Sequence, residues 1–501
     1  MKKLLLGIDI GTTGTKAALF NRDGELLSQG LEPSRLIQIR PGVVEQDLDE
    51  IYEETVRAVR RCLSATSEDP KDVAAISING QMAGICGIDE DWNPVTPYDS
   101  WLDTRCEPFV RMMMDLAGDR IIQLSGGPAS FNHGPKILWW KNEKPESYQR
   151  ISKFVMPSVY VAGKMVGLKS EEAWIDYTYL HFSCLSDLME KQWSKELCAL
   201  FDIDLRKLPK ILNPWDRIGD LSEKEAKEFG LVPGIPIAAG CGDTAATVLG
   251  GGIVRPGMAI DVAGTASCLI TCTDRFTPDV KHRTVMWPRG VIPGLFTPIA
   301  YINGGGLNLE WFKDQFGQAS FQELDRLAET LGPGANRLLS IPHFGGRVCP
   351  NDPHLRGLWM GFSWNHRKEH FYRSLLESIA FEYAFYLKIQ RDLQPEQQFE
   401  EVRVIGGGAK SRVWNQIKAD VLQIPYVRLE QEEFATLGGA IIGGRMVGFW
   451  DDLVEVATRF AKPGGRIDPI RENSIHYQKL SDLYEELLHR MKELFEKLSQ
   501  G

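Results

Sequence analysis

The residue best suited to chemistry in this chain is Asp243, which follows a glycine-rich turn at 240–242 and precedes an alanine-rich stretch. The apolar run before it predicts a short strand, and the alanines predict a helix. A carboxylate between the two is expected at an edge of the sheet, where ligands bind in open α/β folds. There it could accept a proton from a hydroxyl that attacks phosphorus. Aspartate also caps helices in this position, so both interpretations stay open.

A second carboxylate, Asp9, belongs to a glycine-rich pattern that occurs twice. In the first copy, an apolar run at 4–8 leads to Asp9, a turn follows at 11–14, and a second apolar run follows at 17–20. In the second copy, an apolar run at 258–260 leads to Asp261, the turn is at 264–267, and the second apolar run is at 269–270. Each copy predicts a β-hairpin whose turn exposes backbone N–H groups and small hydroxyls. Such turns bind anions, so two of them could hold a polyphosphate from both sides. The alternative is two unrelated hairpins that share turn chemistry.

A third glycine cluster, residues 406–411, ends a predicted strand and begins a predicted helix over 414–421. Three successive glycines allow a flat ligand or a phosphate to approach the backbone. A dinucleotide site is the other interpretation, although Ser411 replaces the third glycine of that fingerprint and no acidic residue follows at the expected distance.

Several other chemistries find no support in the sequence. There is no P-loop string and no Gly-x-Ser-x-Gly nucleophile elbow. His343 and His354 flank Cys349, but their spacing fits no zinc pattern, and a solvated loop is expected there.

Strands that alternate with helices predict an α/β fold. We expect a helix over 47–64 capped by Asp47, and a strand over 73–78 that ends at the polar turn 79–81. The C-terminal segment predicts a long amphipathic helix, most simply packed on its own domain, with an apolar face made of Leu480, Leu483, Leu487, Met491 and Leu494.

Composition narrows the function classes. The 501 residues are too many for one core and predict two domains. The net charge of −10, without a basic stripe, argues against a nucleic-acid partner. Asp9 interrupts the apolar N-terminus, and no apolar stretch reaches membrane-spanning length, so neither a signal peptide nor a membrane partner is expected. Nine scattered cysteines favour reduced thiols and a cytoplasmic location.

Taken in order, these motifs resemble the FGGY family of carbohydrate kinases, within the actin/Hsp70/hexokinase-like superfamily, and among its members they look most like the xylulokinases. The resemblance covers essentially the whole chain and rests on residues 7–13, 79–82, 101–105, 135–139, 242–243, 264–265, 357–361, 374–377 and 406–409.

The resemblance implies a fold of two RNase H-like (actin/hexokinase-like ATPase) domains around a central cleft. Residues 1–240 would form the sugar and phosphate side, and residues 241–501 the nucleotide side. It also implies ATP and Mg²⁺ as cofactors and a small sugar as substrate: a ketopentose such as xylulose or ribulose, a polyol or a sugar acid.

The resemblance also assigns site residues. Asp243 matches the general base, and Asp9 would be catalytic with it, both carboxylates serving the metal. The nucleotide and its phosphates would contact Thr12, Thr13, Gly264, Thr265, Gly306, Glu310, Gly407, Gly408 and Ser411. The sugar would contact Gln81, Met82, Ala83, Asp103 and Asp243.

The departures from the xylulokinase pattern concern the sugar. Ala83 stands where those enzymes typically have a substrate-contacting histidine, and the usual aspartate before Tyr160 is missing. Residues 174–182 are bulkier and more aromatic than expected, which together with Ala83 predicts a reshaped sugar pocket.

Two functions of other classes compete with sugar phosphorylation. An actin/Hsp70-like switch would hydrolyse ATP without sugar, and a sugar sensor would have no kinase activity. The match at Asp243 and the absence of a separate peptide-binding domain favour the kinase. The sequence leaves a homodimer open.

Overall fold

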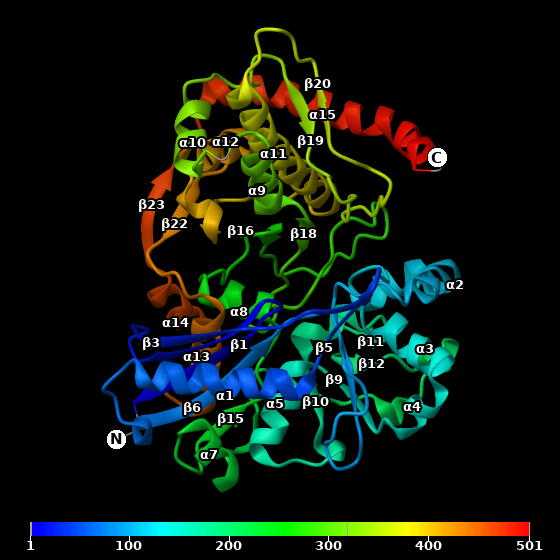
Figure 1. Cartoon of the computed structure of the whole chain (residues 1–501), viewed down its shortest axis with the longest axis vertical. Coiled ribbons are helices and arrows are strands. Elements are labelled where there is room, and N and C mark those ends of the chain that lie inside the picture. Colours follow the sequence, from blue (N-terminus) through cyan, green and yellow to red (C-terminus); the bar gives the residue numbers. More distant parts are fainter. Residues whose placement is uncertain (1–2, 318, 500–501) are drawn as a thin grey trace. The chain divides into compact units, whose positions relative to one another are not determined.

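The computed structural model describes residues 3–317 and 319–499, which form two compact units (Figure 1). Unit 1 contains the described residues up to Val254, together with Trp287–Phe296 and Glu433–Ala461. Unit 2 contains Arg255–Met286, the described part of Thr297–Glu432, and the described residues from Lys462 onward. These units are defined by contacts within the chain, and the domain boundary after residue 240 stays a prediction.

Each unit is built on a six-stranded mixed sheet, and the two sheets have the same topology. In unit 1 the order is β3 (Leu26–Pro33), β2 (Gly14–Phe20), β1 (Leu4–Ile10), β6 (Val73–Gly80), β15 (Pro236–Ala238) and β14 (Arg217–Asp220). In unit 2 it is β18 (Ile299–Ile302), β17 (Ser267–Thr271), β16 (Met258–Ala263), β21 (Glu401–Ile405), β22 (Tyr426–Leu429) and β23 (Pro463–Ile467). In both sheets the first three strands pair antiparallel to one another. The third, fourth and fifth strands pair in parallel, and the sixth strand pairs antiparallel to the fifth.

Both predicted hairpins are confirmed. In the first, the register pairs Leu5 with Phe20 and Ile10 with Thr15, and in the second it pairs Ala259 with Thr271. The predicted strand over 73–78 runs two residues further, through Gly80. Because β1 and β16 are each paired on both sides and carry apolar residues on both faces, they lie at the centre of their sheets.

Small strands extend unit 1 and unit 2 away from the main sheets. They are β4 (Ile37–Arg40), β5 (Val43–Gln46) and β8 (Tyr98–Asp99); β7 (Cys86–Ile88) with β9 (Lys153–Val155); β10 (Trp174–Asp176) with β13 (Lys210–Leu212); β11 (Ser186–Asp187) with β12 (Gln192–Trp193); and β19 (Leu339–Ile341) with β20 (Leu358–Met360).

The helices of unit 1 are α1 (Leu48–Ser64), α2 (Glu107–Ser125), α3 (His133–Glu143), α4 (Pro145–Arg150), α5 (Pro157–Val166), α6 (Lys195–Leu200), α7 (Glu223–Phe229), α8 (Asp243–Gly250), α13 (Ala435–Met446) and α14 (Leu453–Phe460). Of these, α1 and α13 contact the main sheet of the unit most extensively. As predicted, Asp47 caps α1 by accepting hydrogen bonds from the backbone of Asp49 and Glu50.

Two glycines show why α1 and α13 lie so close to this sheet (Figure 1). A Cβ atom at Gly30 would collide with the backbone of α1 at Ala58, and one at Gly7 would collide with the backbone of α13 at Thr436. The strand register places Gly7 and Gly30 on opposite faces, because side chains alternate along each strand. The two helices therefore pack on opposite faces of one sheet.

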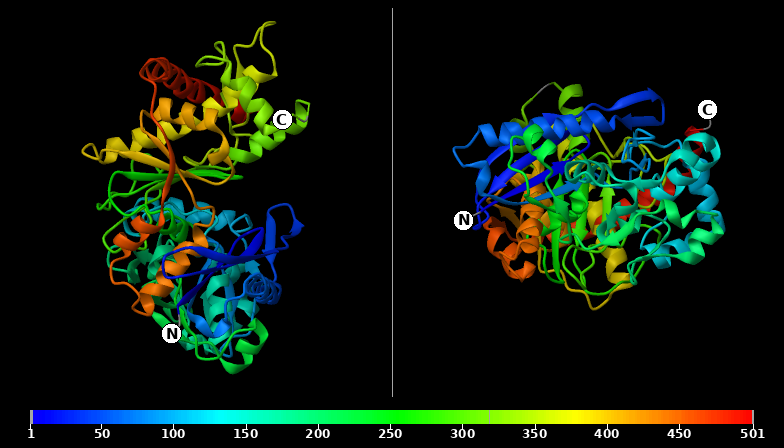
Figure 2. Two further views of the ribbon diagram at one scale, coloured as in Figure 1. Left: turned by 90° about the vertical axis from the view of Figure 1, so that its left-hand side faces the viewer. Right: turned by 90° about the horizontal axis from the view of Figure 1, so that it is seen from below.

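Unit 2 carries α9 (Gly305–Gln315), α10 (Phe321–Glu329), α11 (Lys368–Leu393), α12 (Arg412–Leu422) and α15 (Arg471–Leu498). The C-terminal helix α15, red in Figures 1 and 2, packs against α11 and α12. Two buried glutamates of α11 hold it there. Glu377 accepts a hydrogen bond from Tyr477 over 2.8 Å, and Glu382 accepts one from Tyr484 over 2.7 Å.

The predicted C-terminal helix exists, but its buried face differs from the expected one. Leu487 is buried, whereas Leu483 and Leu494 are exposed, and the buried positions include Tyr477 and Tyr484. The tyrosines are buried because their hydroxyls find carboxylate partners, which an apolar pattern alone does not reveal.

The prediction of a solvated loop is confirmed for His354, which is exposed, but it is wrong for His343. His343 is 2% exposed, and its Nε2 lies 2.9 Å from Glu382 Oε1. Arg347 donates to the other oxygen of the same carboxylate over 3.0 Å. Burial alone would raise the pKa of Glu382, but Arg347 and His343 outweigh it and hold this pKa at about 2. Buried His343 is therefore part of an ion network.

No helix among the described residues is long and apolar enough to cross a membrane.

The ion network predicts a large effect on stability. Glu382→Gln leaves Arg347 buried without its counter-charge and should lower the free energy of unfolding by about 3–5 kcal/mol, measured by urea denaturation of the whole chain. Glu485→Gln is the matched control, because it removes an exposed pair with Lys388 between the same two helices. That variant should lose less than about 1 kcal/mol. Equal losses in both variants would contradict the role of the network.

Candidate active site

Asp9 and Asp243 reach the same edge of the unit 1 sheet. The parallel strands β1, β6 and β15 lie side by side, and Asp9 pairs with Asn79 of β6. Gly80, the last residue of β6, forms a parallel bridge with Gly242, which follows β15. Because the carboxyl ends of parallel strands meet at one edge, the topology brings together two aspartates that are 234 positions apart in sequence.

Asp243 is not the N-cap of its helix, although it bonds to a backbone N–H of the first turn. The N-cap of α8 is Gly242, and Asp243 is the first residue of the helix. Its Oδ1 atom accepts hydrogen bonds from the Thr244 backbone N–H over 2.5 Å and from the Thr244 hydroxyl over 3.1 Å. Gly242 packs closely against Met82: a Cβ atom at Gly242 would overlap with Met82 Cε.

The two carboxylates are electrostatically unfavourable in the absence of ligands. Burial raises the pKa of Asp9, the charge of Asp243 raises it further, Lys16 lowers it, and Glu433 raises it. Burial also raises the pKa of Asp243, against the hydrogen bonds from Thr244, which lower it. The Oδ1 atom of Asp9 is buried without a hydrogen-bond partner. Such a carboxylate oxygen is a good acceptor for a cation or a proton.

Lys16 is a site residue that the sequence analysis missed. It lies opposite Asp9 in the β1–β2 register, and its ammonium bonds to Glu433 over 2.8 Å. A hairpin with its turn at residues 11–14 pairs position 9 with position 16, so the spacing alone could have revealed it.

Thr12 and Gln81, predicted for phosphate and sugar respectively, are hydrogen-bonded to each other over 3.2 Å. Trp101 Nε1 donates to the Thr12 hydroxyl over 2.8 Å, and Gln81 Nε2 donates to Gln46 Oε1 over 2.7 Å. Thr13, next in the turn, is exposed. Trp101 and Gln46 were absent from the predicted site, and only the three-dimensional contact shows that they belong to it.

Ala83 has a left-handed backbone, with φ of 66°. This region is unusual for a residue with a Cβ atom, and such strain is often found at functional sites. Ala83 is half-buried and lies between two buried residues, Met82 and Gly84. A Cβ atom at Gly84 would collide with Tyr98.

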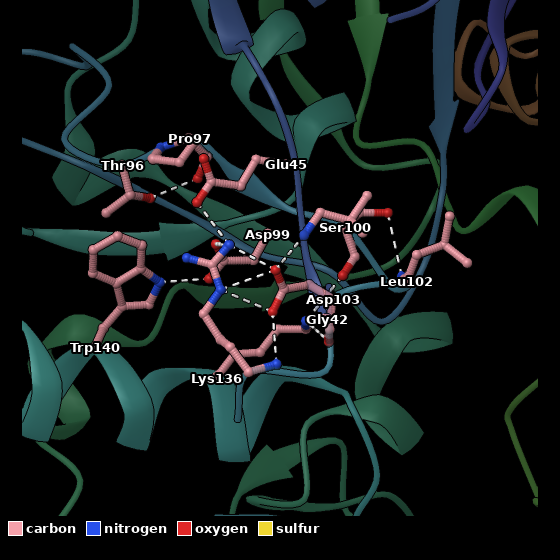
Figure 3. Close-up of polar contacts among 12 residues, drawn as sticks. Gly42, Glu45, Thr96, Pro97, Asp99, Ser100, Leu102, Asp103, Lys136 and Trp140 are labelled. Carbon is pink, nitrogen blue, oxygen red and sulfur yellow. Dashed lines mark hydrogen bonds and ion pairs between the residues drawn. The ribbon is translucent and has the colours of Figure 1, made fainter. Parts of the chain in front are cut away.

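Asp103 lies in a buried ion network (Figure 3). Its carboxylate accepts hydrogen bonds from Arg105 Nε over 2.9 Å and from the Val44 backbone over 2.7 Å. Arg105 also bonds to Glu45 over 2.6 Å. Lys136 donates to the backbone carbonyls of Ser100 and Asp103, so the network fixes the loop that carries Trp101.

Unit 2 brings most of its predicted nucleotide residues together. The Gly306 N–H donates to Gly264 O over 2.9 Å, and the Leu307 N–H donates to Thr265 O over 3.0 Å, so α9 begins on the hairpin turn. A Cβ atom at Gly408 would lie 2.6 Å from Ala263 Cβ, which brings the third glycine cluster against the same hairpin.

The remaining predicted residues of unit 2 lie around this turn. Gly407 is exposed with open space where a Cβ atom would be, as a close ligand requires. Ser411 caps α12 by accepting from the Trp414 N–H over 3.2 Å. Glu310 is exposed on α9 and pairs with Lys313.

The aspartate of the second hairpin has a different environment from Asp9. Asp261 Oδ2 lies 2.5 Å from Lys418 Nζ, and Oδ1 accepts from the Tyr383 hydroxyl over 2.7 Å. Both charged side chains are fully buried. Unit 2 therefore neutralises its aspartate with an internal ammonium.

Comparison with known proteins agrees with this geometry. Residues 4–250 match the FGGY family of carbohydrate kinases, N-terminal domain, and residues 259–447 match the C-terminal domain of the same family. The chain belongs to the FGGY family. It is a carbohydrate kinase, and the family uses ATP.

Relatives of this FGGY kinase act on different sugars. It is 28% identical to the xylulose kinase of Bacillus subtilis (strain 168), over 98% of each chain. It is 26% identical to the gluconokinase of the same organism, over 97% of this chain and 95% of the relative. Membership therefore supports sugar phosphorylation in general and leaves the sugar unnamed.

Solved structures match the fold. The ligand-bound xylulose kinase from Lactobacillus acidophilus superposes with a TM-score of 0.92 at 23% identity, over 99% of this chain and 100% of that one. The Plasmodium falciparum glycerol kinase with ADP gives 0.87 at 19% identity, over 97% and 98% of the two chains. The predicted actin/hexokinase-like ATPase fold is confirmed.

The raised pKa of Asp9 predicts how stability depends on pH. A carboxyl whose pKa is higher in the folded chain contributes stability at acidic pH, and this contribution is lost as pH rises through the folded-state pKa. Asp9→Asn should therefore raise the melting temperature at pH 8 by at least about 2 °C without ligands, and by less at pH 5.

The control is Asp23→Asn, at an exposed turn of the same unit, whose melting temperature should follow the wild type at both pH values. A destabilised Asp9→Asn protein at pH 8 would contradict the electrostatic description.

Proposed function

We propose that this chain transfers the terminal phosphate of ATP to a hydroxyl of a ketopentose, polyol or sugar acid, with Asp243 as general base. The observation that carries the proposal is the pair of partly buried carboxylates, Asp9 and Asp243, at the carboxyl edge of the unit 1 sheet. A cytoplasmic location and a homodimer stay predictions.

Asp9 and Asp243 fit a magnesium ion in their chemistry. The described residues hold no cluster of three or more metal-ligating side chains, but Mg²⁺ in kinases is usually bound by one or two carboxylates with water and substrate phosphates. The unpartnered Asp9 Oδ1 and the negative surroundings support this assignment. When bound, the ion would neutralise charge on the transferring phosphate.

Asp243 is suited to accept the proton of the attacking hydroxyl. Thr244 fixes the carboxylate through two hydrogen bonds to Oδ1, which leaves Oδ2 to face a substrate. Burial raises its pKa, and a base with a raised pKa takes up a proton more readily than an ordinary aspartate. Lys16 supplies a positive charge near Asp9, close to where phosphate charge would develop.

We assign the nucleotide to the surface of unit 2 made by the turn at Gly264 and Thr265, the start of α9 at Gly306, and Gly407. Gly407 is exposed and has open space where a Cβ atom would be, which allows a phosphate chain to approach its backbone. Thr12 and Thr13 are proposed to bind phosphate at the hairpin turn of unit 1.

The sugar is proposed to contact the loop that includes Gln81, Met82 and Ala83. Of these three residues, Ala83 has a left-handed backbone and is the one that is partly exposed, so a substrate can contact it directly. Asp103 is 0% exposed and bound by Arg105, so we propose that it serves the sugar site by holding the loop with Trp101.

The first test removes the base. Asp243→Asn keeps the size of the side chain and should lower kcat for sugar phosphorylation at least about a hundredfold. Binding of ADP, measured by calorimetry, should stay within twofold of the wild type. A turnover near that of the wild type would show that Asp243 does not act as the base.

The second test concerns the sugar. Turnover of D-xylulose, D-ribulose, D-gluconate and glycerol is compared by coupled ADP release. We expect D-xylulose to be a poor substrate, because Ala83 lacks a polar group, and a site built for one hydroxyl pattern can reject another by several orders of magnitude. Ala83→His should shift relative activity toward xylulose, and histidine tolerates the left-handed backbone better than most residues.

The matched control is Ala83→Gly, which relieves the backbone strain without adding a polar ring, and it should leave the xylulose preference unchanged. If the wild type already phosphorylates D-xylulose fastest, the substitution at position 83 has no role in specificity.

A further inference from the structure

The aromatic segment 174–179 lies against the turn that carries Asp243. The indole N–H of Trp174 donates a hydrogen bond to Ala239 O over 3.0 Å. Tyr179 donates its hydroxyl hydrogen to Gly80 O over 2.8 Å, with Cys241 O at 3.4 Å. Thr178 accepts from the Gly242 N–H over 3.1 Å. Three residues of one segment thus contact the turn 239–242, immediately before Asp243.

Thr178 has the most specific of these contacts. Its hydroxyl donates to Asp176 Oδ1 over 2.5 Å, and its backbone N–H donates to the same oxygen over 2.8 Å. Because the hydroxyl hydrogen is given to Asp176, an oxygen lone pair is left for Gly242. The Thr178 side chain is 0% exposed and Asp176 is 2% exposed, so water does not replace these bonds.

The bond from Gly242 has a direct consequence for Asp243. Gly242 is the N-cap of α8, so its position sets the start of the helix and the direction of the next side chain. On the other side, a Cβ atom at Gly242 would meet Met82, and Gly80 N–H donates to Cys241 O over 3.2 Å. The turn is therefore held between the sugar loop and the aromatic segment.

We propose that Thr178, oriented by Asp176, is a positioning residue for Asp243, and that Tyr179 holds the same turn. The proposal rests on Asp243 being the base. The unusual aromatic character of 174–182 then reflects support of the catalytic turn: Trp174, Tyr177 and Tyr179 are each 1% exposed, and none of them offers a surface to a sugar.

The alternative is that Thr178 only stabilises the fold. A stabilising residue would change the melting temperature and leave kcat per folded molecule unchanged. A positioning residue changes kcat, because a small displacement of the base is costly in a proton transfer, while KM for sugar and ATP stays the same.

Thr178→Val tests the proposal, because it keeps the shape of the side chain and removes the hydroxyl. The assay uses the sugar turned over fastest among D-xylulose, D-ribulose, D-gluconate and glycerol. We expect kcat to fall about tenfold, the scale of one lost buried hydrogen bond, with both KM values within twofold. Thr178→Ser restores the hydroxyl and should recover at least half of the wild-type kcat.

The matched control is Ser183→Ala, which removes a buried hydroxyl just after this segment, where it bonds to Leu180 O over 2.7 Å and to the Ser186 hydroxyl over 2.8 Å. Its kcat should stay within twofold of the wild type. If Thr178→Val fails to fold, Tyr179→Phe tests the same turn and should lower kcat at constant KM.

Three results would overturn the proposal: an unchanged kcat in Thr178→Val, equal losses of kcat in Thr178→Val and Ser183→Ala, or an effect confined to KM. Asp243→Asn, assayed in parallel, distinguishes a failure of the positioning role of Thr178 from a failure of Asp243 as the base. If that variant is inactive while Thr178→Val is normal, Asp243 remains the base and only the positioning role fails. If Asp243→Asn is active, the proposed base itself fails.

Discussion

The burial of two carboxylates, Asp9 and Asp243, at one edge of a sheet is the constraint on which the site of unit 1 depends. Burial and mutual repulsion raise the pKa of Asp9, and Lys16 compensates only in part. The sheet topology imposes this proximity, because β1, β6 and β15 end at one edge. A site that is unfavourable when empty becomes favourable when a cation or a proton arrives, and phosphoryl transfer to an alcohol supplies both.

The duplicated hairpins show two solutions to the same electrostatic problem. Both units place an aspartate before the turn of a central strand pair, within sheets of the same topology. In unit 2 the buried ammonium of Lys418 neutralises Asp261, so the charge of that aspartate is compensated without a ligand. In unit 1 the Oδ1 atom of Asp9 has no partner. Unit 1 therefore compensates its hairpin aspartate only in part, through Lys16, whereas unit 2 neutralises its own.

The sequence predicted both hairpins, the capped helix after Asp47 and the turn of Asp243, because glycine turns and apolar periodicity are local signals. It also named Gln81 and Asp103, but not their distant partners. Gln46 accepts from Gln81, and the Val44 N–H donates to Asp103, and both contacts depend on how segments far apart in the chain meet. His343 was misjudged for the same reason, since its partner Glu382 lies 39 residues away on α11. Buried ion networks of this kind have no periodic signature in a chain.

Carboxyl titration by ¹³C NMR tests the central claim most directly. Protein labelled at the aspartate side chains, with signals assigned through the Asp9→Asn and Asp243→Asn variants, is titrated without ligands and again with Mg²⁺ and a non-hydrolysable ATP analogue. Both carboxyls should titrate above the usual aspartate range without ligands, and the pKa of Asp9 should fall when the metal and nucleotide are added. Ordinary pKa values for both residues, unchanged by the ligands, would contradict the claim that this pair forms the phosphoryl-transfer site.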